Sequence, residues 1–201
     1  MMTRCPWCEK TDTYIKYHDQ EWGVPVLNDR KQFEFLVLES AQAGLSWLTI
    51  LNKRENYRKA YDDFNPVKVA AYNNNKIEEL MNNPGIIRNR RKIEASINNA
   101  KHFLEIQQEF GSFSDYLWKF VDYKQITNYY SDLKDIPAIT ELSDQVSKDL
   151  SKRGFKFIGS TIMYSHLQAV GIVNDHLTSC FRYREISQKY HDLDLRNEIE
   201  R

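Results

Sequence analysis

The sequence predicts an all-α protein. Glycine and proline are scarce, with 7 and 5 among 201 residues. Apolar residues recur mostly at helical spacing, and no stretch alternates apolar and polar residues convincingly, as a half-exposed strand would. Hydrophobic residues make up 41% of the chain, which is enough to bury a sizeable core. A chain of this length is expected to form one domain or two small lobes.

The first predicted helix runs from residue 29 to about residue 43, with Asn28 as its cap. Its apolar residues lie on more than one face, so we expect a buried, central helix. Glu39 should therefore be partly buried, which is costly for a carboxylate that has no partner. We interpret Glu39 as a site residue. The alternative is a structural acid bonded to a backbone amide or a tyrosine.

The later helices are predicted from the same spacing and from their caps and glycine or proline boundaries. They cover about 46–61, 66–72, 76–81, 88–110, Ser112 or Ser114 through 121, 143–153 and 160–170. Residues 123–139 are the least regular stretch and are predicted to be a loop. The charged tail from 182 onward has weak helical periodicity and is expected to fray.

Composition limits the function classes. The 28 basic and 28 acidic residues cancel, so DNA binding would need a local basic patch. No apolar run has membrane-spanning length, and the N-terminus does not resemble a signal peptide. We expect a cytoplasmic protein without membrane contact. The three cysteines favour metal binding or free thiols over disulfides.

Three of the four tryptophans fall within the first 47 residues, among acidic and other aromatic side chains. The group is Trp7, Tyr14, Tyr17, His18, Asp19, Glu21, Trp22, Glu39, Gln42, Ser46 and Trp47. Such a cluster is typical of a pocket that stacks on a flat ring or holds a cation against π faces. A shared core seam is the alternative, and composition does not decide between them.

Residues 147–161 have the pattern of two helices joined by a tight turn, with Gly154 and Gly159 on either side of it. The second helix offers unpaired amides at its N-terminus, where a phosphate can bind. The nearby cations are Lys148, Lys152, Arg153 and Lys156. This pattern suits a sequence-independent contact with the DNA backbone. An ordinary helical hairpin with solvated lysines is the alternative.

A second basic cluster lies at the predicted start of the long helix. It contains Arg88, Arg90, Arg91 and Lys92. Cations at this end oppose the helix dipole, so a phosphate backbone would explain them. A solvated charged face is the competing interpretation.

A third group has the residue types of a metal site. His176 and Cys180 are one helical turn apart if their segment is helical, and Cys5 and His18 could complete a tetrahedral zinc site. Such a site would hold the N-terminus against the C-terminal region. The spacing between Cys5 and Cys8 is also that of a zinc knuckle, so Cys8 is an alternative ligand. Free thiols remain possible on spacing alone.

Long motifs in this order resemble the 3-methyladenine DNA glycosylase I family. They are Tyr17-His18-Asp19-Gln20-Glu21-Trp22-Gly23-Val24-Pro25, Glu39-Ser40-Ala41-Gln42-Ala43-Gly44-Leu45-Ser46-Trp47, Gly85-Ile86-Ile87-Arg88, Arg153-Gly154-Phe155-Lys156-Phe157-Ile158-Gly159 and Asn174-Asp175-His176. The resemblance covers roughly residues 4–181 without large gaps.

The resemblance implies a helix-hairpin-helix DNA glycosylase fold, with two helical lobes and a pocket between them. It implies a structural Zn²⁺ that ties the termini together. The family's ligands map onto Cys5, His18, His176 and Cys180, and Cys8 departs from the pattern. We expect a glycosylase domain over residues 1–185 and a charged tail over residues 186–201.

The resemblance also implies hydrolytic removal of 3-methyladenine from alkylated double-stranded DNA, with the free base as product. We expect a monofunctional enzyme without a lyase step, monomeric and associated with the nucleoid when on DNA. Glu39 is the candidate catalytic residue, and Tyr17 and Trp47 would sandwich the base. The expected base-binding residues are Trp7, Tyr17, Trp22, Glu39 and Trp47. The expected DNA-binding residues are Arg153, Gly154, Phe155, Lys156 and Gly159.

The chemistry follows from the charge of the substrate. Methylation at N3 makes the adenine nucleoside cationic, so the base is a good leaving group without an acid to protonate it. Much of the superfamily has a catalytic aspartate shortly after the hairpin, where this chain has Asn174 or, with a slip of one residue, Asp175. A nucleic-acid-binding module without catalysis and an interaction protein that uses the aromatic patch are the other classes.

Overall fold

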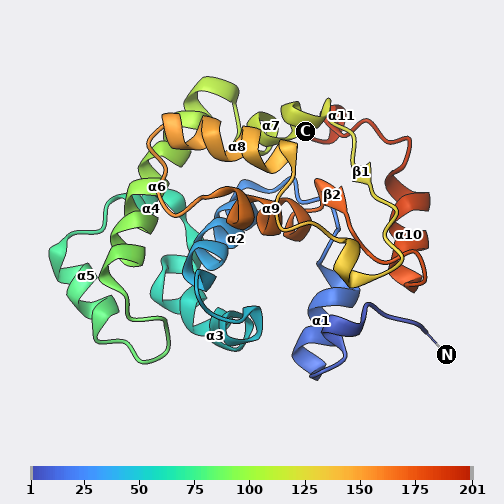
Figure 1. The fold of residues 1–201 in the computed structure, drawn as a ribbon. Coiled ribbons are helices and arrows are strands. Elements are labelled where there is room, and N and C mark those ends of the chain that lie inside the picture. Colours follow the sequence, from blue (N-terminus) through green and yellow to red (C-terminus); the bar gives the residue numbers. More distant parts are fainter. Residues whose placement is uncertain (1, 200–201) are drawn as a thin grey trace.

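A computed structural model describes residues 2–199. The protein is mostly helical, as predicted (Figure 1). The helices are α1 (Asp12–Gln20), α2 (Asp29–Gln42), α3 (Trp47–Ala60), α4 (Pro66–Ala70), α5 (Asn74–Met81), α6 (Arg90–Phe110), α7 (Phe113–Trp118), α8 (Glu141–Lys152), α9 (Ser160–Ala169), α10 (Phe181–Tyr190) and α11 (Arg196–Ile199). Short 3₁₀ turns are η1 (Pro6–Cys8), η2 (Asp62–Phe64), η3 (Lys119–Val121) and η4 (Leu133–Asp135).

The helix boundaries follow the capping chemistry of the sequence. The side chain of Asn28 accepts from the amide of Lys31 at the start of α2, and Ser46 caps α3 in the same way. Gly154 follows the end of α8 with a φ of 96°, a conformation that favours glycine. A Cβ there would also lie 2.6 Å from the ring of His102. The predicted end of this helix at Gly154 therefore has two causes, the positive φ and the lack of space for a Cβ.

Two features were not predicted. Helix α1 begins at Asp12, with Thr11 as its cap, in a segment for which no helix is predicted above. Residues 123–139 contain η4 and a strand, β1 (Ile126–Thr127), which pairs in parallel with β2 (Val173–Asn174). Strands of two residues are too short to show an alternating pattern.

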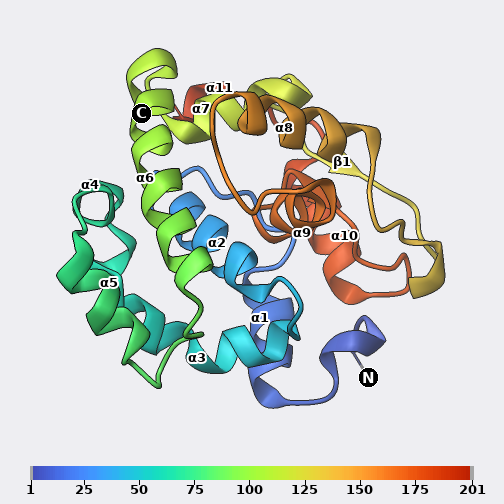
Figure 2. The same ribbon diagram turned by 60° about the vertical axis from the view of Figure 1, so that its left-hand side comes forward.

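Helix α2 lies at the centre of the fold, as predicted. It packs against α3, α6, α7 and α9, and Figure 2 shows it between α6 and α9. Its side chains are buried on every face, including Phe33, Phe35, Leu36 and Leu38. Because α2 has neighbours all round, its polar side chains are also taken out of water.

The segment after residue 185 continues as helix, since α10 extends to Tyr190. Beyond it Leu195 is buried and donates its backbone N–H to the carbonyl of Tyr123. The expected division between residues 185 and 186 thus falls inside α10, and residues 200–201 of the expected tail lie outside the described range. Among the helices described, none combines the length and apolarity needed to cross a membrane.

Candidate functional site

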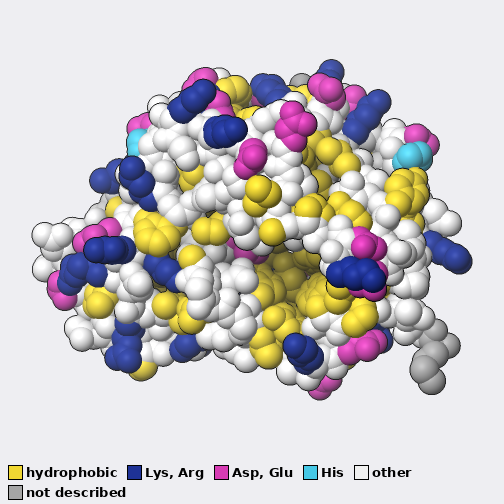
Figure 3. Space-filling model, in the orientation of Figure 1, with side chains coloured by type: hydrophobic (Ala, Val, Ile, Leu, Met, Phe, Trp, Pro, Cys, Tyr) yellow, Lys and Arg dark blue, Asp and Glu magenta, His cyan; other side chains and the backbone are white. Residues whose placement is uncertain are grey.

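A pocket of about 320 Å³ opens in the hollow on the face drawn in Figure 3, where hydrophobic side chains gather. It is lined by Trp7, Tyr14, Tyr17, Trp22, Glu39, Gln42, Trp47, Leu133, Ile136, Ser165 and Gln168. These residues come from η1, α1 and the turn after it, α2, α3, η4 with Ile136 just beyond it, and α9. The structure thus brings together all five residues expected to contact a base.

The aromatic rings of the pocket contact one another at steep angles. Trp7 meets Trp22 edge-on, with ring centroids 5.1 Å apart and an interplanar angle of 79°. Tyr17 and Trp47 have centroids 5.6 Å apart and planes at 58°. A flat ring sandwiched between two others needs near-parallel planes roughly 7 Å apart, because each stacking contact spans about 3.5 Å. The two rings do not form a sandwich in this arrangement, so the expected sandwich of Tyr17 and Trp47 around a base stays a prediction that requires one ring to move.

Glu39 lies in the last turn of α2 and is 3% exposed. No hydrogen bond or ion pair reaches its carboxylate from any residue that the structure describes. Burial raises the pKa of Glu39 to about 8 because the charged form is desolvated. The structural alternative, an acid bonded to an amide or a tyrosine, does not apply. Glu39 is the one carboxylate lining this pocket among the described residues.

The pocket also contains residues that sequence reasoning missed. Ser165 and Gln168 come from α9, and Leu133 and Ile136 come from the stretch predicted as a loop. No local signal marks them, because they reach the pocket only through the packing of α9 and η4 against the N-terminal segment. The spacing of Ser165 and Gln168, three residues apart on a helix, places them on one face and is the only sign in the sequence.

Neither candidate for a superfamily aspartate is available in the pocket. Asn174 is fully buried in β2. The Asp175 carboxylate accepts from the Tyr164 hydroxyl at 2.5 Å, from Asn128 at 2.6 Å and from Gln168 at 2.8 Å. Three donors hold the Asp175 carboxylate in place, so it supports the wall that carries Gln168.

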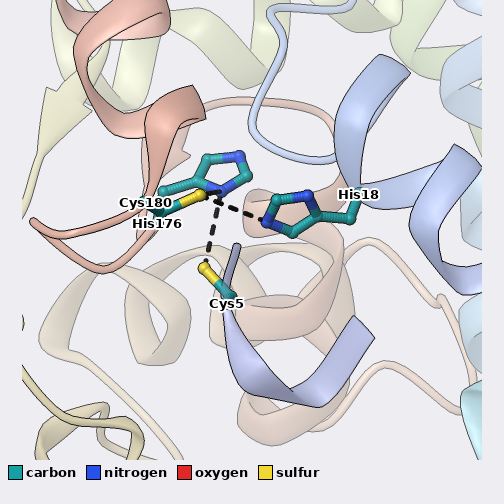
Figure 4. A group of neighbouring side chains, drawn as sticks. All are labelled: Cys5, His18, His176 and Cys180. Atoms are coloured by element: carbon teal, nitrogen blue, oxygen red, sulfur yellow. Dashed lines mark hydrogen bonds between the residues drawn. The ribbon is translucent and has the colours of Figure 1, made fainter. Parts of the chain in front are cut away.

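Four buried side chains converge in one place (Figure 4). Their two imidazole rings contact Trp7 and Trp22, which form the tryptophan wall of the pocket. The donor atoms of Cys5, His18, His176 and Cys180 all lie within 4.8 Å of one another. The Cys180 sulfur is 3.5 Å from His18 Nε2 and 3.6 Å from His176 Nδ1, and the Cys5 sulfur is 3.7 Å from the same Nδ1. Sulfur and nitrogen ligands of a tetrahedral zinc ion lie roughly 3.6 Å apart, given the usual bond lengths. Cys8 is buried but stands outside this cysteine–histidine cluster.

In each histidine, the ring nitrogen that points away from the cluster has a hydrogen-bond acceptor, as is usual for histidines that bind a metal. His18 Nδ1 lies 2.7 Å from the Asp19 carboxylate, and His176 Nε2 lies 3.0 Å from the carbonyl oxygen of Trp22. An N–H donated to these oxygens leaves the other nitrogen, the one facing the cluster, unprotonated and free to bind a metal. The ring of His176 also packs edge-on against Trp22, at 4.6 Å between centroids. The cluster is thus the support behind the tryptophan wall.

The hairpin loop, residues 153–159 between α8 and α9, departs from expectation at one position. Phe155 is 3% exposed and belongs to the core. Arg153 donates to Glu109 at 2.6 Å and to Asp149 at 2.9 Å. Phe155 is enclosed in the core and does not reach the surface, whereas Arg153 is held at the surface by two carboxylates, so its expected DNA contact stays a prediction. Lys156 is exposed and forms no ion pair among the described residues.

The basic cluster at the start of α6 divides in the same way. The Lys92 ammonium donates to the carbonyls of Ala41 and Ala43 and closes the end of α2. Arg90 pairs with Glu78. Arg88 and Arg91 are exposed, and within residues 2–199 they have no ion-pair partner. Two of the four cations therefore remain available to a phosphate backbone.

Comparison with known proteins assigns the chain to a family of base-excising DNA glycosylases. The profile described as methyladenine glycosylase matches residues 7–183. The chain belongs to the methyladenine glycosylase family.

Named relatives match over nearly their whole length. DNA-3-methyladenine glycosylase 1 of Escherichia coli (strain K12) is 49% identical over 182 residues, which are 90% of this chain and 97% of the relative. DNA-3-methyladenine glycosylase of Haemophilus influenzae is 48% identical, with shares of 90% and 97%.

Solved structures agree with the sequence relatives. A crystal structure of 3-methyladenine DNA glycosylase I superposes with a TM-score of 0.86 at 50% identity and covers 89% of this chain and 98% of its own. The enzyme from Staphylococcus aureus, solved to explain 3-methyladenine recognition, has a TM-score of 0.86 at 42% identity, with shares of 90% and 96%.

Proposed function

We propose that this chain excises 3-methyladenine from alkylated DNA, and that it recognises the base in the pocket around Glu39. It is a DNA repair glycosylase, a hydrolase of the N-glycosidic bond. The observation that carries the assignment of the site is a buried, unpartnered carboxylate enclosed by aromatic rings. Such a site favours a flat ligand that is positively charged.

The energetics of flipping explain the need for selectivity. Turning a base out of the duplex costs a few kcal/mol, and stacking on aromatic side chains returns about 1–3 kcal/mol per base. Stacking alone therefore only offsets the flip for any base. A cation held against an aromatic face contributes about 2 kcal/mol more when it is desolvated. The positive charge of the N3-methylated nucleoside is what the pocket can distinguish.

Glu39 adds to this selectivity through its own ionisation. In the free protein, burial favours the protonated acid, since its pKa is raised to about 8. A cationic base in the pocket favours the carboxylate instead, because an opposite charge lowers the pKa of an acid. Glu39 then accepts hydrogen bonds from the amino edge of the base and stabilises positive charge that develops on the sugar as the bond breaks.

The hydrolysis itself needs little from the protein. Water supplies the new hydroxyl oxygen at the sugar carbon and loses one proton to the solvent, while the bond electrons leave with the cationic base, which departs neutral. No acid is required to protonate such a leaving group. No lysine lines the pocket among the described residues, so the amine nucleophile of a lyase step is missing. This supports a monofunctional glycosylase.

We further propose a structural zinc ion held by Cys5, His18, His176 and Cys180. Two thiolates and two imidazoles at these separations suit a closed tetrahedral site. Four protein ligands leave no open position, so the ion would stabilise the fold and take no part in hydrolysis. A helix-hairpin-helix arrangement formed by α8, the hairpin loop and α9 is part of the same proposal, with the pocket between two lobes.

The contact with the DNA backbone is assigned to the cations that remain unpaired. Lys156 on the hairpin loop and Arg88 and Arg91 near the start of α6 satisfy this condition. Phosphate contacts of this kind position the duplex without reading its sequence. A monomer suffices, because the pocket and these cations belong to one chain.

The test is base release from methylated duplex DNA, measured by chromatography. Wild-type protein should release 3-methyladenine and leave 7-methylguanine in place. Glu39→Gln keeps hydrogen-bonding capacity but no charge, and should lower the release rate by about a hundredfold, a size typical of losing an electrostatic contact in a site. Near-normal release by the variant would exclude the electrostatic role of Glu39.

A binding module without catalysis is the alternative to exclude. Tryptophan fluorescence on adding free 3-methyladenine separates the two, because Trp7, Trp22 and Trp47 all line the pocket. A protein that quenches with the free base yet releases none from DNA would be a binder of the base without activity.

A further inference from the structure

An exposed aromatic side chain stands in a strained backbone conformation on the hairpin loop. Phe157 has a φ of 54° and is 37% exposed. A bulky residue is rare at positive φ, and such strain is retained where the surrounding structure enforces it, often at functional sites. Glycine would fit this position better, and burial does not explain the phenyl ring. The ring therefore requires another reason.

The conformation of Phe157 is enforced by two other helices. Its carbonyl oxygen accepts from the Ser40 hydroxyl of α2 at 3.2 Å. At the preceding residue, the Asn99 side chain of α6 binds both the N–H and the carbonyl of Lys156 at 2.8 Å. Asn98 holds the carbonyl of Gly154, also at 2.8 Å. Figures 1 and 2 both show the loop between α8 and α9 passing beside α6.

The ring of Phe157 borders a groove of about 410 Å³. The groove is lined by Arg91, Glu94, Ala95, Asn98, Lys156 and Phe157. Arg91 and Lys156 have no ion-pair partner in the described part of the chain, whereas Glu94 approaches only Arg90, at 3.8 Å. The groove thus offers one aromatic face with two free cations. This is the composition of surfaces that bind a nucleic-acid strand through base stacking and phosphate contacts.

The groove is close to the base pocket. Ser40, which holds Phe157, follows Glu39 directly in α2. Successive residues of a helix point about 100° apart, so the pocket and the hairpin loop lie against neighbouring faces of the same turn of α2. A DNA strand whose damaged base enters the pocket would bring a neighbouring nucleotide to the groove.

We propose that Phe157 packs against a nucleotide of the DNA close to the flipped one, while Arg91 and Lys156 contact its phosphates. This inference rests on the proposed function, since it takes alkylated DNA as the ligand. It adds a second aromatic contact outside the base pocket. The strain at Phe157 is retained because the ring must face the DNA.

The variant Phe157→Gly tests this proposal, because it removes the ring and the backbone strain together. Thermal unfolding should show equal or higher stability, and quenching by free 3-methyladenine should be unchanged. Binding to a duplex that carries a tetrahydrofuran abasic site, measured by fluorescence anisotropy, should weaken about tenfold, the size expected for one lost stacking contact. The kcat/KM for base release from methylated duplex should fall by a similar factor. Phe157→Tyr keeps the ring and should keep wild-type values.

Two outcomes would overturn the inference. Unchanged duplex affinity in Phe157→Gly would show that the ring makes no contact with DNA. A variant that loses stability and free-base binding together would show a purely structural role. The anisotropy measurement needs no catalysis, so a wild-type protein that binds the duplex but releases no base would refute the proposed function while still testing Phe157.

Discussion

Helix α2 carries two buried glutamates that the protein treats in opposite ways. Glu34 is 2% exposed and Glu39 is 3% exposed. Glu34 accepts from Arg54 at 2.7 Å and from Arg58 at 2.8 Å, and the Lys31 ammonium lies 3.2 Å away. Glu39 has no such partner among the residues described. Two glutamates of one helix are thus equally buried, but Glu34 has cationic partners within the protein and Glu39 has none.

The cause is the face on which each glutamate lies. Five residues along a helix correspond to a rotation of about 140°. Glu34 faces α3, where Arg54 and Arg58 follow each other at the i,i+4 spacing. Glu39 faces the aromatic pocket, which has no cation among its described lining residues. A buried carboxylate with partners holds the fold together, and one without partners is unstable until a cation arrives.

The largest loss of stability should follow from disrupting the cysteine–histidine cluster, in which the donor atoms of all four side chains lie within 4.8 Å of one another. If it binds zinc, purified protein should contain about one zinc ion per chain, and chelation should lower the unfolding midpoint strongly. Cys180→Ser should abolish zinc retention, because it removes one of four ligands. Elemental analysis combined with thermal unfolding measures both. Cys8→Ser is the matched control and should retain the metal; a variant that loses it would make Cys8 a ligand.

The comparison of the two glutamates predicts a smaller but opposite pair of effects. Glu34→Gln should lower the free energy of unfolding by about 2 kcal/mol, because it removes the charge from a buried carboxylate that Arg54 and Arg58 hydrogen-bond, although both arginines keep a second carboxylate partner. Glu39→Gln breaks no ion pair and should raise the free energy of unfolding by up to about 3 kcal/mol near neutral pH, because glutamine avoids the protonation that burial imposes on Glu39. Urea denaturation of the two variants measures the difference.

The rate of base release should be affected in the opposite way: the variant that loses stability should keep its activity, and the other should lose it. Folded Glu34→Gln should release base at close to the wild-type rate, whereas Glu39→Gln should not. Equal losses of stability in the two variants would contradict the distinction between them.

The smallest effect, counted per pH unit, is a pH dependence of stability that belongs to Glu39. Its pKa is about 8 in the folded protein, against an ordinary value of 4.5. Between these values the folded state binds more protons, so the free energy of unfolding falls as pH rises, by at most about 1.4 kcal/mol per pH unit. Denaturant unfolding from pH 5 to pH 8.5 should show this slope in wild type and a weaker one in Glu39→Gln. Parallel curves would mean that Glu39 titrates normally.

Much of this organisation follows from local sequence. The cap at Asn28 and the end at Gly154 come from residue chemistry that acts within one turn of helix. The burial of Glu39 follows from apolar residues on both sides of α2. The lack of a partner for Glu39 did not follow, because a buried acid bonded to an amide or a tyrosine has the same sequence pattern.

The features that could not be predicted from the sequence depend on contacts between distant segments of the chain. Arg153 is attached to the hairpin pattern in sequence, yet its partner Glu109 lies 44 residues earlier. The angle between Tyr17 and Trp47 depends on how α1 packs against α3. Gln168 reaches the pocket because α9 crosses beside α2. None of these relations has a local signature.

The cysteine–histidine cluster also determines when the protein can become active during its own synthesis. Cys5 and His176 lie 171 positions apart in the chain, and the imidazole of His176 rests against Trp22 in the pocket wall. A growing chain has the pocket residues up to Trp47 early, but it lacks their support until His176 and Cys180 have been added. An incomplete chain can therefore contain the pocket residues without being able to form the finished wall.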